Sequence, residues 1–344
     1  MRPAKIGSQL TLASWIALAL APLALGEWSL TQLAQYMAYG IFAMGLAFIW
    51  GQVGVLSFGQ ALFFGLGAYS MGLVSLGRVP LLGESSLTGL LLALIVPAIA
   101  AYIFGRLLFL GRGLSGAYFA IVTLCASVVA QTLAEQSSFL GGFNGLLGIP
   151  PFTAPWQGRD AYMTSGETYY LMLAIAALIF VVLLWIVRSP LGTVLAAIRE
   201  DDRRTAFFGY DVTRFKVWAF VASAVISGAA GALFVKQFGF ASPSLIGFAL
   251  STEVLIWVAV GGRQIVMAAF LGALIVRWIE GQLSERLGNF WLLALGLLFA
   301  ATVVLMPFGL FGRILALPLP RRLRFGKTAP PQEIGAVHQD KRSR

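Results

Sequence analysis

The fold is decided by residues 188–216, which read RSPLGTVLAAIREDDRRTAFFGYDVTRFK. This stretch lies between apolar segments that are each long enough to cross a bilayer. It nevertheless holds six of the chain's 24 Lys and Arg residues and four of its 14 Asp and Glu residues. Because charged groups are costly in hydrocarbon, the stretch must lie outside the lipid.

The same stretch carries start and stop signals for a helix. Ser189 and Pro190 suit a helix N-terminus, because a serine oxygen can cap free N–H groups and proline fits the first turn. Gly209 suits the position just after a helix. We therefore predict one amphipathic helix over about 189–209, of about four to five turns at 3.6 residues per turn. A connecting loop that only fixes topology is the alternative to a helix that docks into a soluble partner.

Composition indicates a polytopic membrane protein. The 344 residues are 59% hydrophobic and only 11% charged, which leaves too little polar surface for a soluble globule. The net charge of +10 does not indicate nucleic-acid binding, because the basic residues lie at the ends of apolar spans and in the tail. The single cysteine excludes an intramolecular disulfide.

Hydropathy predicts an all-α fold of about ten transmembrane helices, some of them short or broken. A span needs about 20 apolar residues. The first segment, about 10–25, could also be a signal peptide, but we favour a retained span. The predicted spans are about 10–25, 30–50, 54–76, 87–110, 115–134, 168–187, 215–238, 248–262, 264–282 and 289–312.

The distribution of basic residues predicts the topology. With both termini in the cytoplasm, most of the 24 Lys and Arg residues lie on the cytoplasmic side, as the positive-inside rule requires. Residues 189–209 are then cytoplasmic, and a loop at about 136–167 is extracytoplasmic. We expect a permease domain over 1–312 and a basic cytoplasmic tail over 313–344, disordered and close to anionic lipid headgroups.

Two segments suggest how the spans pack and where a solute could pass. Residues 51–72 are rich in glycine and contain Ser57 and Gln60, a pattern typical of a broken helix beside a solute path or of close helix packing. Ser223, Ser227, Gly228 and Gly231 form a small-residue stripe on the span 215–238 and predict a packing face. Glu253 is costly beside a short apolar span unless it faces water or a partner, although it could instead offset a helix dipole. For the translocation path we select Ser57, Gln60, Tyr118 and Glu253.

Several motifs in order resemble one family. The permease subunits of ABC importers for branched-chain amino acids, urea and short-chain amides show similar sequences over about residues 30–313. Arg204 and Thr205 stand where the amino-acid type commonly has two alanines, so the chain looks closest to the urea-type second permease. The motifs are LSFGQALFFGLGAYSMG, GAYFAIVTL, GGFNGLLGIP, SPLGTVLAAIREDDRRTAFFGYD, SGAAGALF, STEVLIWVAVGGR and WLLALGLLFAATVVLMPFGLFG.

The resemblance implies a permease subunit of an ATP-driven importer in the inner membrane. Its expected partners are a second homologous permease, two cytoplasmic ATP-binding subunits, an extracytoplasmic solute-binding protein and membrane lipid. It also implies that the helix at 189–209 couples the permease to the ATPase. The coupling residues are then Ser189, Arg199, Glu200, Asp201, Asp202, Arg203, Arg204 and Gly209, with Arg199 to Arg204 forming ion pairs with the partner.

A stand-alone secondary transporter or channel for a small polar solute is the competing interpretation. It would need titratable groups in the spans for proton coupling, and Glu253 is the best of them. An enzyme is disfavoured, because one cysteine, one tail histidine and no paired carboxylates make no catalytic constellation. We expect no metal, no cofactor and no catalytic residue in this chain.

Overall fold

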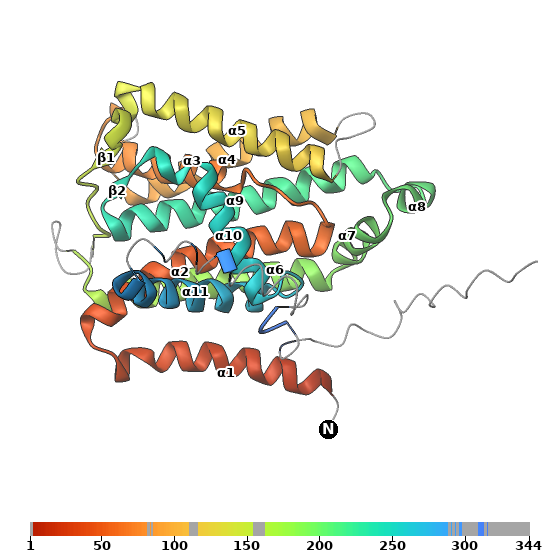
Figure 1. The fold of residues 1–344 in the computed structure, drawn as a ribbon, viewed down its shortest axis with the longest axis horizontal. Helices are drawn as coiled ribbons and strands as arrows, with labels where there is room; N and C mark the ends of the chain where they lie inside the picture. The colour runs from red at the N-terminus through yellow and green to blue at the C-terminus, as the bar shows by residue number, and fades with distance from the viewer. Residues whose placement is uncertain are drawn as a thin grey trace, which may run out of the picture.

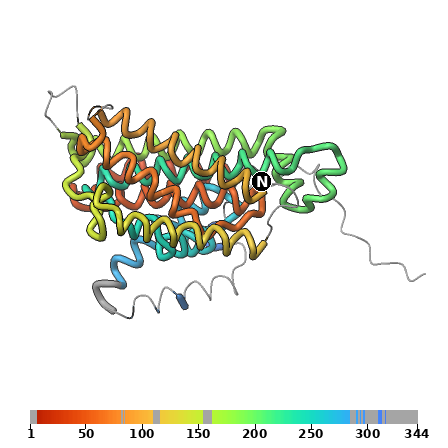
Figure 2. The backbone as a smooth tube through the Cα atoms, turned by 90° about the horizontal axis from the view of Figure 1, so that it is seen from above, coloured from red at the N-terminus to blue at the C-terminus, as the bar shows by residue number. Residues whose placement is uncertain are grey.

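The protein is a bundle of long helices that run roughly side by side (Figures 1 and 2). The structure, a computed structural model, describes residues 3–80, 83, 85–109, 116–153, 162–287, 290, 293, 296–297, 309–312 and 315. Within these ranges, seven helices are long and apolar enough to cross a membrane. The predicted helical, polytopic fold class is confirmed.

Helices make up most of the described residues, and the strands are short. The long helices are α1 (Pro3–Ala24), α2 (Glu27–Phe48), α4 (Ser86–Phe109), α5 (Ala117–Gln136), α6 (Ser165–Arg188), α9 (Val212–Phe238) and α11 (Val266–Leu287). The shorter helices are α3 (Gln60–Ser75), α7 (Pro190–Glu200), α8 (Asp202–Phe207) and α10 (Phe248–Gly261). A π-helical turn, η1 (Ile49–Val53), extends α2, and 3-10 turns occupy Ser138–Leu140, Gly142–Asn144 and Pro243–Leu245. The strands are β1 (Leu146–Leu147) and β2 (Phe240–Ala241).

Each predicted span from 10–25 to 264–282 corresponds to a helix. The predicted span 54–76 begins too early, because α3 starts only at Gln60 after a non-helical segment. Most of the predicted span 289–312, and all of the tail 313–344 except Leu315, lie outside the described residues. Helix α1 is mostly exposed along the bundle's edge (Figure 1), where the carbonyl of Leu18 accepts a 2.5 Å hydrogen bond from the Tyr169 hydroxyl.

Helix α9 forms the centre of the bundle and packs against α2, α3 and α4. Small residues allow this contact: a Cβ on Gly67 would lie 2.1 Å from the carbonyl oxygen of Gly228, and one on Gly231 would lie 2.0 Å from that of Phe64. Ser223, Ser227 and Gly228 are all buried in the same contact. The predicted packing stripe on this helix is therefore confirmed, and glycine is required where the backbones touch.

The two ends of the bundle differ. At one end β1 pairs antiparallel with β2, which ties the loop after α5 to the end of α9. The Lys236 ammonium donates to the Pro150 carbonyl over 3.1 Å at this end. Helices α7 and α8 project from the opposite end (Figures 1 and 2), so the charged segment and the loop lie on different sides of the bundle.

Candidate functional site

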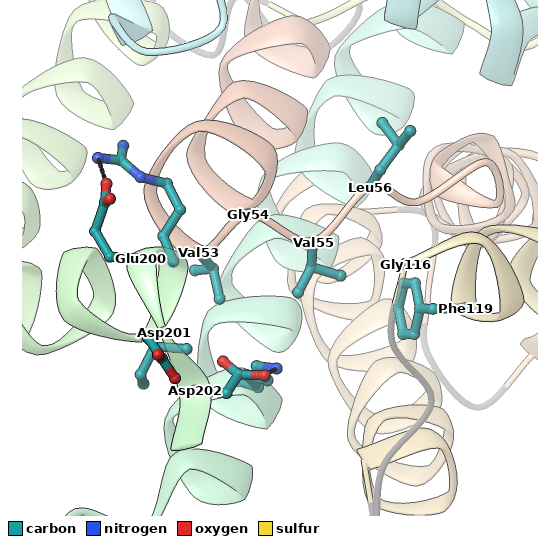
Figure 3. Close-up of a pocket in the computed structure, with 12 residues that line it drawn as sticks. Val53, Gly54, Val55, Leu56, Gly116, Phe119, Glu200, Asp201 and Asp202 are labelled. Carbon is teal, nitrogen blue, oxygen red and sulfur yellow. Dashed lines mark hydrogen bonds and ion pairs between the residues drawn. The ribbon is translucent and has the colours of Figure 1, made fainter. Parts of the chain in front are cut away.

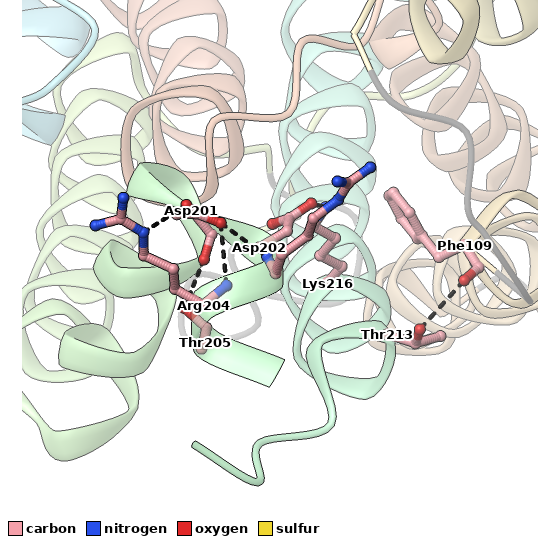
Figure 4. Close-up of polar contacts among 8 residues, drawn as sticks. Phe109, Asp201, Asp202, Arg204, Thr205, Thr213 and Lys216 are labelled. Carbon is pink, nitrogen blue, oxygen red and sulfur yellow. Dashed lines mark hydrogen bonds and ion pairs between the residues drawn. The ribbon is translucent and has the colours of Figure 1, made fainter. Parts of the chain in front are cut away.

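The charged segment forms two helices, and the prediction of one helix over 189–209 is wrong. Asp201 interrupts it with φ −160° and ψ 106°. Its Oδ1 accepts hydrogen bonds from the backbone N–H groups of Arg203 and Arg204, each at 3.0 Å (Figure 4). An aspartate can offer the backbone this alternative to a continuous helix, so α8 starts anew with Asp201 as its N-cap. These N–H groups, that of Arg204 first, hold the pKa of the Asp201 carboxyl below its usual range.

The predicted ends of the segment are partly correct. Pro190 occupies the first turn of α7, and Gly209 adopts a left-handed φ of 87° just after α8. Ser189 does not cap α7 with its side chain. Its hydroxyl instead donates to the carbonyl of Ile186 over 2.7 Å, at the end of α6. The Ile186 carbonyl also accepts from the Ser189 backbone N–H over 3.2 Å, so Ser189 closes the end of α6 with both its backbone and its side chain.

Several of the charged side chains contact the permease itself. Arg199 Nη1 donates to the Gly51 carbonyl over 2.6 Å, and its Nη2 lies 3.1 Å from Glu200 Oε1. Asp202 pairs with Lys216 on α9, whose side chain is only 11% exposed. Among residues 199–204 the exposed charges are those of Glu200, Arg203 and Arg204, of which Glu200 also pairs with Arg199 and Arg204 with Asp201.

A cavity of about 220 Å³ lies between this segment and the bundle (Figure 3). One wall is the chain from Val53, the last residue of η1, to Leu56, and the other is the α7–α8 junction. Gly116 and Phe119 at the start of α5 and Lys216 on α9 complete the lining. The junction between α7 and α8 therefore faces the point at which α2 ends and the chain unwinds.

The outer surface of the segment is apolar as well as charged. Phe207 is 91% exposed and Phe208 is 82% exposed at the end of α8. An open groove runs beside α7, with Leu191, Tyr210 and Phe215 in its lining. Sequence reasoning missed the two phenylalanines, although two adjacent aromatic residues in a strongly charged stretch are an available signal for a contact surface.

The predicted break in the glycine-rich segment is present. Gly54 has a φ of 80°, and residues 54–59 are not helical. The chain there is held by hydroxyl groups from other helices: Thr123 Oγ1 accepts from the Phe58 N–H at 3.2 Å, and Ser251 Oγ accepts from the Ala61 N–H at 3.1 Å. Close packing is also present at Gly59 and Gly67, and the solute path beside the break stays a prediction.

Ser57 and Gln60 both lie at this break and are fully buried. Ser57 Oγ accepts from the Gly59 N–H over 3.3 Å, as in a local turn. Gln60 Nε2 donates to Ser223 Oγ at 2.8 Å and to Ser227 Oγ at 2.7 Å. Its Oε1 is buried without a hydrogen-bond partner among the described residues, an arrangement that needs an explanation such as a water molecule or a change of conformation.

Tyr118 and Glu253 lie in other surroundings. Tyr118 is 73% exposed on the first turn of α5, so within this chain it faces outward. A Glu253 carboxylate oxygen lies 3.7 Å from the Arg277 guanidinium, which makes a closer 2.8 Å pair with Glu280. The Arg277 guanidinium also stacks 4.3 Å from the ring centre of Tyr39 and 5.6 Å from that of Trp257. The four residues selected for the path therefore do not form one cluster.

The described part of the chain holds no group of three or more His, Cys, Asp or Glu side chains arranged to bind a metal ion. What it offers is a broken helix, buried hydroxyl and amide groups at the break, and a charged segment joined to it. These features suit a protein that changes conformation to pass a solute.

Comparison with known proteins identifies relatives across most of the chain. The relatives include the high-affinity branched-chain amino acid transport system permease protein LivM of Salmonella typhimurium, 32% identical over 80% of this chain and 68% of LivM. BraD, a permease of the same kind from Pseudomonas aeruginosa, is 23% identical over 80% of this chain and 92% of BraD. The ribose import permease protein RbsC of Haemophilus influenzae is 26% identical over 73% of this chain and 76% of RbsC. No solved structure gives a significant match.

A family model described as the permease component of branched-chain amino acid transport systems matches residues 29–310. This range includes the broken helix, the α7–α8 segment and the Glu253–Arg277 pair. The predicted resemblance to this class of ABC permeases is confirmed at the level of the family. The chain is a multi-pass membrane protein that belongs to the permease-component family of branched-chain amino acid transport systems.

Proposed function

We propose that this permease works as one half of the membrane part of an ATP-driven importer, and that α7 and α8 dock on a soluble ATP-binding subunit. Its partners are a second homologous permease, two ATP-binding subunits and a solute-binding protein on the opposite side. The single observation that carries this proposal is the exposed pair Phe207 and Phe208, at 91% and 82% exposure, on a segment that projects from the bundle.

Exposed aromatic side chains on a charged helix favour a protein partner. Helices α7 and α8 project past one end of the bundle (Figure 1), so we place the rings of Phe207 and Phe208 outside the lipid tails. Aromatic residues and arginine are enriched in interface contacts. Glu200, Arg203 and Arg204 are exposed on the same segment as the rings, which suits a partner surface of mixed charge.

The solute is best assigned from the relatives. LivM and BraD are named for branched-chain amino acid transport, so we propose a branched-chain amino acid as the first candidate. Urea or a short-chain amide is the second, favoured by the sequence motif around Arg204 and Thr205. Ser57, Gln60, Tyr118 and Glu253 remain our proposed path residues, with Tyr118 facing the second permease.

The orientation follows from charge. With α7, α8 and both termini in the cytoplasm, the basic residues satisfy the positive-inside rule, and the β1–β2 end faces the solute-binding protein. A bacterial inner membrane suits this arrangement. A stand-alone transporter is disfavoured, because it would have no use for a projecting aromatic surface on α8.

Radiolabelled uptake tests this function. Cells that lack the gene are compared with cells in which it is restored, using leucine, urea and acetamide at micromolar concentration. Loss and rescue of leucine uptake alone supports the amino-acid assignment, and loss of urea or acetamide uptake alone supports the second candidate. Unchanged uptake of all three solutes refutes both assignments. Replacing Phe207 and Phe208 by serine should abolish uptake and co-purification of the ATP-binding subunit, while membrane insertion stays normal.

A further inference from the structure

Arg199 lies inside the α7–α8 segment, but its guanidinium turns back toward the bundle. Nη1 donates to the Gly51 carbonyl over 2.6 Å, and the side chain is 28% exposed. The stem of Arg199 passes close to Gly54, where a Cβ would lie 3.0 Å from Arg199 Cγ. The side chain therefore lies along the turn η1 and leaves little of its surface for a partner.

The carbonyl that Arg199 holds is available because a helix ends there. Gly51 lies in the last turn of η1, where carbonyl groups have no further N–H of the helix to accept from. A hydrogen bond from a guanidinium is charge-assisted and is stronger than one between neutral groups. Arg199 on α7 thus donates to a carbonyl group that has no hydrogen-bond partner within the interrupted helix.

The turn is also fixed from its other side. A Cβ on Gly51 would lie 1.9 Å from the carbonyl oxygen of Arg263, so the two backbones touch. Gln52 Nε2 donates to the carbonyl of Gln264 over 3.1 Å, and the Arg263 guanidinium stacks 5.2 Å from the Trp50 ring centre. The turn η1 is therefore held between α7 and the connection from α10 to α11.

The turn leads directly to the break at the buried path residues. Residues 54–59 are not helical and join η1 to Gln60, the first residue of α3. The backbone of this joint is held at Phe58 by the Thr123 hydroxyl, and Ala61 in the first turn of α3 is held by the Ser251 hydroxyl. Through the Gly51 carbonyl, Arg199 thus connects α7 to the turn that leads into the break.

We propose that Arg199 is a positioning residue that transmits the movement of α7 and α8 to the broken helix at 51–60. It does so through the Gly51 carbonyl and not through an ion pair with the ATP-binding subunit. This inference rests on the proposed function for its role in transport. The hydrogen bond between Arg199 and the Gly51 carbonyl, which we call the tether, is a property of the permease alone.

The test compares three variants of the full chain. Arg199→Leu keeps the stem but removes the donor, and Arg199→Lys keeps a charged donor. Arg214→Gln is the control, because Arg214 is 75% exposed near the same end of the bundle, pairs with Asp211 and does not contact η1. Each variant is assayed for amide hydrogen exchange over 51–59, for co-purification with the ATP-binding subunit and for solute moved per ATP hydrolysed.

The tether predicts a specific pattern. In Arg199→Leu, exchange over 51–59 should rise about tenfold or more, the scale expected for one lost charge-assisted hydrogen bond. Co-purification and ATP hydrolysis should persist, while solute moved per ATP falls by about the same factor. Arg199→Lys should recover a large part of both losses, and Arg214→Gln should leave exchange over 51–59 unchanged.

Two results would overturn the proposal. Unchanged exchange over 51–59 in Arg199→Leu would mean that the turn does not depend on Arg199. Loss of co-purification with Arg199→Leu would place Arg199 in the contact with the partner. Failure of the proposed function is distinguishable, since the unmodified chain would then show no ATP-dependent uptake while the exchange measurement, which needs no partner, still reports on the tether.

Discussion

Gln60 donates its amide N–H to Ser227 Oγ over 2.7 Å, which joins the first residue of α3 to the middle of α9. The same amide reaches Ser223 Oγ at 2.8 Å, and all three side chains are fully buried. Ser223 in turn donates to the Gly45 carbonyl on α2 at 2.7 Å. One amide therefore links three helices at the level where the chain resumes its helix.

Replacing Gln60 with alanine should destabilise the permease. The change removes the donor to two buried hydroxyls and leaves their acceptor positions unsatisfied, at a cost of about 1–3 kcal/mol. Thermal unfolding in detergent measures this cost. Thr132→Ala is the control, because Thr132 is exposed on α5 and should change stability by less than about 0.5 kcal/mol. Equal stability of the two variants would contradict the role given to Gln60.

Replacing Gly67 with alanine should separate α3 from α9. The added Cβ would lie 2.1 Å from the Gly228 carbonyl oxygen, so the helices must move apart at a cost of about 1–3 kcal/mol. Gly166→Ala is the matched control, since its Cβ would meet nothing within 4 Å and alanine favours a helix. Fluorescence-detected gel filtration after heating compares them. A Gly67→Ala variant as heat-resistant as Gly166→Ala would refute the close contact.

The sequence predicted the helices and the α9 packing face because both depend on local composition. A run of about 20 apolar residues predicts a span wherever it occurs, and the small-residue stripe from Ser223 to Gly231 predicts close contact. The glycine-rich composition of 51–72 likewise indicated a broken helix, although the predicted span 54–76 began too early. These features need no knowledge of which residues meet across the fold.

The side-chain roles in the charged segment could not be predicted in the same way. The sequence places six charged residues at 199–204, but their roles depend on distant partners: Gly51 for Arg199 and Lys216 for Asp202. Asp201 also broke the predicted helix, because its side chain competed successfully for backbone N–H groups. The sequence likewise did not predict Arg277 as the basic partner of Glu253, because the two residues meet only in the folded structure.

Arg277 should matter more for folding than Glu253. Arg277→Ala would leave Glu253 and Glu280 without their counter-charge in a partly buried site, at a cost below the about 3–5 kcal/mol of a fully buried pair. Glu280→Gln removes the ion pair at 2.8 Å, and Glu253→Gln removes only the looser one at 3.7 Å. We therefore expect Arg277→Ala to lower stability most, Glu280→Gln less and Glu253→Gln least. Yield of folded protein in detergent ranks the three variants.

The same variants separate a path role of Glu253 from a structural one. If Glu253 lines the path, Glu253→Gln should lower solute uptake severalfold while its yield stays close to that of the unmodified chain. Normal uptake by this variant would leave Glu253 as a partner of Arg277 and no more.

The cap at Asp201 predicts a dependence on pH. Asp201→Ala should raise amide exchange over 202–207 at pH 7, whereas Asp201→Asn should preserve most of the protection, because asparagine also caps helices. The folded-state pKa of Asp201 lies below its unfolded value of about 3.9. The cap therefore contributes fully above about pH 4 and is lost as the pH falls through the lower folded-state value. Exchange over 202–207 in the alanine variant equal to that in the unmodified chain would show that the carboxyl does not hold α8.

The most direct test of the central claim is solute uptake into proteoliposomes that contain the permease with its partner subunits. ATP is enclosed on the side of the ATP-binding subunits, and radiolabelled leucine with the solute-binding protein is supplied on the other. The account predicts uptake that requires ATP hydrolysis and that is lost when Phe207 and Phe208 are replaced by serine. Uptake by this chain alone, without ATP or partners, would contradict it.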